Sequence, residues 1–228
     1  MDSTRVIPIF PLPLVQFPGA LTPLHVFEPR YRKLLKDVLE ADRTFGITAR
    51  AEEEEDSIPS KPPLGSIGCT VEVAVVQELP DGRSNVLCVG GRRYRLLDYV
   101  EGEPYLQASV EFFDDETEFD DLAWEVGQVK ALFERVLIAG RKMKEEREGA
   151  PAEMPDLPDA AQPLSFIVAA YLDIDLTEKQ QLLELTDTGE RLRETHRILA
   201  KLVDDYERRA LVKSLARRNG HGGKAPEL

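Results

Sequence analysis

The side chains best suited to acid–base or nucleophilic chemistry are three histidines, His25, His196 and His221, and two cysteines, Cys69 and Cys88. Cys69 could act as a nucleophile with His25 as its base. A reactive thiolate needs an electropositive, partly exposed setting, whereas Cys69 lies inside an apolar, β-branched run. We therefore expect both cysteines to be buried thiols. His196 lies on an apolar helical stripe, so we expect it to occupy a core position. We predict no catalytic residue in this sequence.

Signatures of the common enzyme and metal-binding classes are missing from the sequence. It has no G-x-x-x-x-G-K-[ST] phosphate loop, no H-E-x-x-H, no G-x-S-x-G and no C-x-x-C pair. Gly90-Gly91 lacks the spacing of a dinucleotide-binding loop. We therefore expect a protein that is not an enzyme, has no cofactor and no metal site, and neither hydrolyses ATP nor cleaves casein.

The formal net charge is −13, from 29 basic and 42 acidic residues in a chain of 228. This charge repels nucleic-acid phosphates and anionic lipid headgroups, so neither nucleic acid nor a membrane is an expected partner. The basic patch Arg92-Arg93-Tyr94-Arg95 could contact an anion or RNA, but local ion pairing is the expected role. The acidic run at 52–56 is expected to be a solvated loop.

The sequence shows no targeting signal. Its apolar runs are shorter than the roughly 18 residues that a membrane-spanning helix needs, and its proline-broken N-terminus does not resemble a signal peptide. Without an export signal, both cysteines are expected to be thiols in a reducing cytosol, which predicts a cytoplasmic protein.

Residues 1–118 contain short apolar runs separated by Pro and Gly, a pattern typical of strands and turns. We predict a curled, mainly antiparallel β lobe here, with one helix at about 29–41. The segment 79–83 is typical of a turn between two strands, with Gly82 at a positive φ. Gly90-Gly91 permits a bulge or a bend in the strands that follow.

Residues 119–212 have apolar residues at helical spacing, which predicts a helical lobe. The helices at about 120–147 and 188–212 are expected to be the longest. Thr177-x-x-Gln180 is typical of a capping box that opens a shorter helix. Residues 213–228 are expected to form a flexible tail, so the predicted fold class is α+β.

The segment from Pro8 to Arg32 combines six prolines with many large apolar residues. Because proline stiffens the chain, this segment can expose apolar groups without collapsing. Glu28 and Arg32 stand four residues apart at the start of the predicted helix, a spacing typical of an ion pair. The alternative for each apolar residue is that it fills the core. The candidate polypeptide-binding residues are Phe17, Pro18, Leu24, Phe27 and Tyr31.

Two blocks of this segment have a recognisable order. Residues 11–19 read P-L-x-x-x-x-F-P-G, and residues 23–31 read PLHVFEPRY. A turn at 79–83 and a G-x-x-R at 90–93 follow in order. Over about residues 6–205 the chain resembles the Lon-protease N-terminal, or substrate-binding (LON), domain family. The residues that carry the family motif are Glu28, Arg30, Tyr31, Asp81, Gly82, Gly90 and Arg93.

The resemblance implies an N-terminal PUA-like β pseudo-barrel with one helix, followed by a C-terminal helical lobe. In Lon proteases this module precedes an ATPase ring and a protease, and helps to engage unfolded or degron-bearing substrates. The sequence stops where those parts would begin, which implies a stand-alone, non-catalytic member. Binding of a polypeptide or a protein partner is the expected function.

Three alternatives remain open at this point. One is a small-molecule or RNA-related module, by analogy with other PUA-like folds, for which a basic face would be the sign. Another is a regulator that docks on a separate Lon protease. The third is an unrecognised hydrolase, for which a cleft with a perturbed histidine or carboxylate would be the sign. The partner and the oligomeric state are not determined by the sequence.

Overall fold

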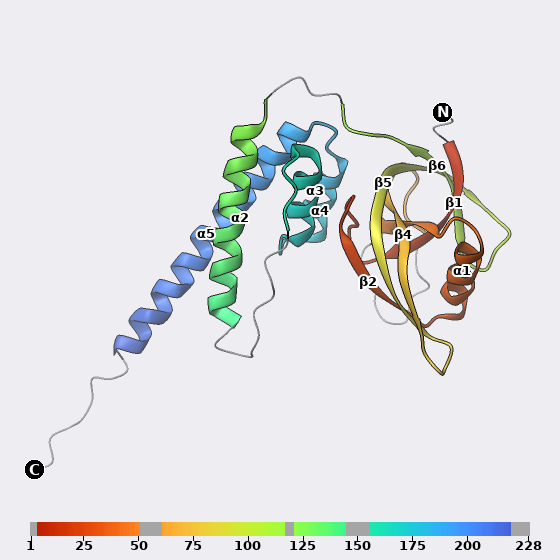
Figure 1. Cartoon of the computed structure of the whole chain (residues 1–228), viewed down its shortest axis with the longest axis horizontal. Coiled ribbons are helices and arrows are strands. Elements are labelled where there is room, and N and C mark those ends of the chain that lie inside the picture. Colours follow the sequence, from red (N-terminus) through yellow and green to blue (C-terminus); the bar gives the residue numbers. More distant parts are fainter. Residues whose placement is uncertain (1–3, 51–60, 117–120, 145–155, 220–228) are drawn as a thin grey trace, which may run out of the picture.

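The computed structural model describes residues 4–50, 61–116, 121–144 and 156–219. The acidic run at 52–56 and the last part of the expected tail, 220–228, lie outside these ranges. The described residues form six strands and five helices, so the fold is α+β as predicted. Figure 1 shows a β-barrel on one side and a group of helices on the other.

The barrel closes through a pairing between β5 and β6. The strand order is β2-β5-β4-β3-β1-β6, and β6 returns to pair with β5, which leaves β2 outside the closed ring. β1 and β3 run parallel and the other pairs are antiparallel, which confirms the curled, mainly antiparallel sheet. The strands are β1 (Thr4–Leu12), β2 (Leu21–Val26), β3 (Thr44–Ala49), β4 (Ile67–Glu78), β5 (Ser84–Val100) and β6 (Leu106–Phe112).

β5 is one long strand that changes register at its glycines. Val71 pairs with Gly90, but Cys69 pairs with Arg93, so β5 carries an extra residue and forms a bulge. The Gly90 N–H donates to the Ala20 carbonyl at 2.9 Å. A Cβ at Gly90 would lie 2.0 Å from the carbonyl oxygen of Phe17, so only glycine lets the chain pass this closely.

Helix α1 (Pro29–Glu40) covers the side of the barrel that faces away from the other helices (Figure 1). Proline suits the first turn of a helix because its missing N–H has no partner there. One face of α1 is apolar and buried against β-strand residues such as Phe10 and Phe45. A second apolar cluster, with Ile7, Ile9 and Tyr94, fills the part of the barrel lined by β1, β5 and β6.

The helical part contains α2 (Ala123–Lys144), α3 (Ala161–Tyr171), α4 (Leu176–Glu184) and α5 (Thr188–Asn219). α2 and α5 lie side by side and are the longest of the described helices, as predicted. α5 continues past residue 212, where a tail was expected to begin. The predicted capping box at Thr177 was wrong: the α4 cap is Asp175, whose carboxylate accepts the Glu178 N–H at 2.8 Å.

The turn at Gly82 allows a direct test of backbone strain. Gly82 has φ +79° and its N–H donates to the Leu79 carbonyl at 2.9 Å, which confirms the predicted turn. We expect Gly82→Val to lower the free energy of unfolding by about 1–2 kcal/mol, because a β-branched residue is strained at positive φ. Urea unfolding would measure this. Gly102 also has a positive φ and open space around it, so a similar loss in Gly102→Val would support backbone strain as the cause.

Candidate functional site

The outer face of β2, β5 and β4 carries aligned rows of side chains. Strand pairing places Pro23, Leu87 and Val75 in one row across the three strands. The next row holds His25, Asn85 and Gln77. The His25 ring nitrogen Nδ1 lies 2.7 Å from Asn85 Oδ1, and Asn85 Nδ2 donates to Gln77 Oε1 at 3.3 Å. An apolar row and a polar row therefore adjoin on one side of the barrel.

This outer face exposes large apolar side chains. Leu21 is 61% exposed, Val75 is 57% exposed, and Phe27, just beyond the end of β2, is 57% exposed. The Phe27 ring lies near the His25 ring, with centroids 5.9 Å apart. A shallow hollow of about 410 Å³ lies between β2, β4 and β5. Large exposed apolar side chains gathered on one face are typical of an interaction site.

Only part of the predicted binding set lies at this surface. Phe17 is fully buried in the core that contains the helices, and Tyr31 is buried with its ring stacked on Phe10, centroids 3.9 Å apart. Pro18 is half-buried near α3, and Leu24 is half-buried against the barrel core. Phe27 alone of the five is prominently exposed. The structure does not bring the five together at one surface.

Sequence reasoning missed several residues of the outer face. Leu21 lies just before the motif block that begins at Pro23, and Val75 lies in the same apolar, β-branched run as Cys69, which was expected to be buried. Along β2 exposed and half-buried residues alternate, but the apolar Leu21 and Pro23 are exposed and the polar Thr22 is half-buried, so apolar alternation in the sequence does not mark them. In β4 a register shift between Val73 and Val75 disrupts that alternation.

The family-motif residues hold turns and contacts rather than one pocket. The predicted Glu28–Arg32 ion pair was wrong: the Glu28 carboxylate accepts from Arg30 at 2.7 and 2.9 Å, and Arg30 lies over the Tyr31 ring. Asp81 accepts the Arg83 N–H at 3.1 Å across the Gly82 turn, and this bond holds the pKa of Asp81 below its usual value.

Arg93 lies at the centre of a buried ion cluster that joins the barrel to the helices. Its guanidinium donates to the Asp115 carboxylate and to the Leu183 carbonyl, the latter at 2.8 Å. Arg191 of α5 donates to the same carboxylate, and its guanidinium lies 3.8 Å from the Phe166 ring centroid. We call Arg93, Asp115 and Arg191 the interlobe clasp. Burial is the main cause that lowers the pKa of Arg93, and the Asp115 charge opposes it.

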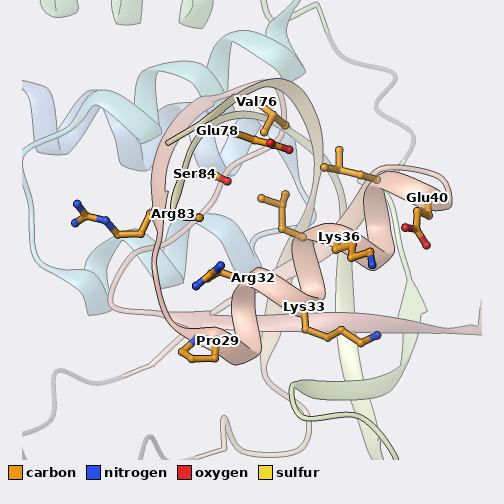
Figure 2. Close-up of a pocket in the computed structure, with 12 residues that line it drawn as sticks. Pro29, Arg32, Lys33, Lys36, Glu40, Val76, Glu78, Arg83 and Ser84 are labelled. Carbon is orange, nitrogen blue, oxygen red and sulfur yellow. The ribbon is translucent and has the colours of Figure 1, made fainter. Parts of the chain in front are cut away.

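A second hollow, of about 620 Å³, lies between α1 and the β4–β5 turn (Figure 2). Figure 2 shows Arg32 and Arg83 at one side of it and Lys33, Lys36 and Glu40 at the other. Arg83 is ion-paired with Asp81, and Lys33 with Asp37. Because both signs of charge surround this hollow, it is less suited to an apolar segment than the outer face.

Catalytic and metal-binding groups do not gather in the described part of the chain. Cys69 and Cys88 are buried free thiols, as predicted. His196 is half-buried rather than in the core, because its position on α5 lies at the edge of the apolar stripe. His25 is exposed on the outer face of β2, whereas Cys69 is buried on β4. The structure therefore does not support His25 as a base for Cys69. No group of three potential metal ligands and no helix able to cross a membrane occurs among the described residues.

The buried thiols predict how stability depends on pH. Burial raises the pKa of Cys69 to about 12 and that of Cys88 to about 11, whereas unfolded thiols ionise near pH ~8.5. Above that pH the unfolded chain binds fewer protons than the native one, so the free energy of unfolding should fall as pH rises from about 8.5 towards about 11. Urea unfolding at about pH 7.5 and about pH 9.5 checks this. A Cys69→Ala, Cys88→Ala variant with an equally steep decline would contradict it.

The barrel, the interlobe clasp and the helical part define an α+β domain with an open apolar face on one side. The sequence model of the ATP-dependent protease La (LON) substrate-binding domain matches residues 6–201. The chain belongs to this family.

Several curated sequence relatives are Lon proteases. Lon protease 2 of Herpetosiphon aurantiacus is 32% identical over 209 residues, which cover 90% of this chain and 25% of the relative. The Lon protease of Anaeromyxobacter dehalogenans is 30% identical over 197 residues, covering 84% and 22%. The chain thus spans about a quarter of the length of these curated relatives.

Two solved structures share the fold. The Lon N-terminal domain protein from Xanthomonas campestris matches with a TM-score of 0.61 at 24% identity, over 83% of this chain and 96% of that one. The N-terminal domain of the Mycobacterium avium complex Lon protease matches with a TM-score of 0.58 at 20% identity, over 88% and 99%.

Proposed function

We propose that this chain binds unfolded polypeptide without catalysis, and that the outer face of β2, β5 and β4 is the binding surface. The observation that carries the proposal is the exposure of three large apolar side chains on this face: Leu21 on β2, Phe27 just beyond the end of β2, and Val75 on β4. Membership of the LON substrate-binding domain family supports a role in substrate recognition. The hollow on this face is shallow and open, which suits a chain segment better than an enclosed small molecule.

Charge adds a preference among polypeptides. The net charge of −13 attracts basic segments and repels acidic ones, mainly through the association rate. The RNA-related alternative gains little support, because Arg92 pairs with Asp114 and Arg93 with Asp115. The two buried free thiols fit a reducing compartment, and we place the protein in the cytoplasm.

Removal of the large apolar side chains of the outer face should weaken polypeptide binding. We expect Leu21→Thr, Phe27→Ala and Val75→Thr combined to reduce affinity for a reduced, alkylated basic protein such as lysozyme by about tenfold or more, because apolar contact area is lost. Stability should change little, since all three side chains are exposed. Fluorescence anisotropy with labelled unfolded protein measures the affinity.

The matched control changes exposed apolar residues elsewhere. Trp124 and Ile138 lie on α2 and are 68% and 49% exposed. A Trp124→Ala, Ile138→Ala variant should bind as the unaltered chain does. Equal losses in both variants, or equal affinity for folded and unfolded lysozyme, would contradict the proposal.

A further inference from the structure

β2 presents one unpaired edge. Among the described strands it pairs with β5 alone. The Gly90 N–H donates to the Ala20 carbonyl, and these residues directly precede the Leu21–Val89 pair in the same register. Because bonded and non-bonded pairs alternate in an antiparallel ladder, Thr22, Leu24 and Val26 face β5 with their backbone groups. The backbone groups of Leu21, Pro23 and His25 therefore point away from β5.

Proline at position 23 is consistent with this alternation of backbone groups along β2. Its missing N–H removes nothing from the β2–β5 ladder, because that nitrogen lies on the free edge. Apart from the ladder, no backbone hydrogen bond within the described residues involves Leu21, Pro23 or His25. Leu21 and His25 each offer an N–H and a C=O at this edge, and Pro23 offers a C=O. The side chains of the same three residues are exposed on the outer face.

We infer that β2 accepts an extended segment of another polypeptide as an added antiparallel strand, the pairing that is the more stable per residue. This inference rests on the proposed function and specifies how the segment is held. Extended backbone is the conformation that places its own N–H and C=O groups opposite alternate residues of a strand edge. Every second side chain of the segment then lies beside Leu21, Pro23 and His25. A segment with apolar residues at alternate positions and little acidic charge fits this arrangement.

A second copy of this chain fits the edge less well. Two β2 strands paired symmetrically about Pro23 would place two residues without N–H groups opposite each other, which removes both bonds of the central pair. Two chains of charge −13 also repel each other. Proline on an edge strand is a common protection against such self-pairing. The occupant is therefore a different chain with alternating apolar side chains.

Backbone methylation of a peptide separates strand addition from contact through side chains alone. The probe is a short peptide in which valine and threonine alternate between terminal lysines, in three forms: unmodified, N-methylated on every valine, and N-methylated on every threonine. In an antiparallel added strand with its valines against the outer face, the valine N–H groups point at β2. Methylation of valine should weaken binding by about tenfold or more, and methylation of threonine should leave the affinity within about twofold.

Substitution at position 25 tests the same bond from the side of this chain. His25→Pro removes the N–H at the free edge, and His25→Thr removes the same imidazole but keeps the N–H. We expect His25→Pro to bind the unmodified peptide about three- to tenfold more weakly than His25→Thr, with both variants folded by circular dichroism.

The outcomes separate this inference from the proposed function. Equal affinity of the two methylated peptides, a larger loss from threonine methylation, or equal affinity of the two position-25 variants overturns antiparallel strand addition. The proposed function survives that result if unfolded lysozyme still depends on Leu21, Phe27 and Val75. Binding of neither the peptides nor unfolded lysozyme at tens of micromolar overturns both. The expected order of affinities supports strand addition.

Discussion

Asp115→Ala is expected to lower the free energy of unfolding by about 3–5 kcal/mol, since it leaves two buried guanidinium groups without their shared counter-ion. The Asp115 carboxylate accepts from Arg93 and Arg191, and also from the Thr188 hydroxyl at 2.6 Å. The side chains of Asp115, Arg93 and Arg191 are 4%, 2% and 0% exposed. Replacement of a whole buried ion cluster by well-packed apolar residues often changes stability little. Removal of one partner is strongly destabilising, because it leaves a buried charge without compensation.

The neighbouring residue provides a matched control. Asp114 pairs with Arg92 at 2.8 Å, but both side chains are more than half exposed. Exposed ion pairs contribute about 0–1 kcal/mol, so Asp114→Ala should change stability by no more than that. Urea unfolding of both variants measures the difference. Similar losses of unfolding free energy in Asp114→Ala and Asp115→Ala would show that burial of the clasp does not determine its contribution to stability.

The clasp also shows where the sequence was informative and where it was not. The sequence predicted local ion pairing for Arg92 and Arg93, because a basic patch in an acidic chain has carboxylates within reach. It did not indicate that Arg93 would be buried or that Arg191, almost a hundred residues later, would share its partner. Such a cluster forms only when two separate parts of the chain meet, and no local pattern reports that meeting.

Local signals predicted the fold well. Pro29 and the apolar spacing after it predicted α1, and Gly82 and Gly90 predicted a turn and a bulge. These features depend on a few neighbouring residues. The binding surface depends instead on which strands pair: Val75 lies beside Leu87 and Pro23 only because β4, β5 and β2 are neighbours in the sheet. Exposure on such a surface is not encoded by any one of these segments.

Phe17 and Phe27 show the contrast between the two roles expected for apolar residues of the N-terminal segment, core packing and polypeptide binding. Phe17 is fully buried and packs with helical residues such as Leu164 and Val168 in a shared core. Phe17→Ala should therefore lower the free energy of unfolding by about 3–5 kcal/mol, through lost burial and the cavity that remains. Urea unfolding followed by circular dichroism measures this loss.

Phe27→Ala should show the opposite pattern. Because the Phe27 side chain is more than half exposed, its removal should change stability by no more than about 0.5 kcal/mol. Affinity for reduced, alkylated lysozyme should fall, whereas Phe17→Ala, measured where it remains folded, should keep most of its affinity. A Phe17→Ala variant that stays as stable as the unaltered chain but loses binding would return Phe17 to the binding surface and remove it from the core. The pair of variants thus separates packing from recognition within one proline-rich segment.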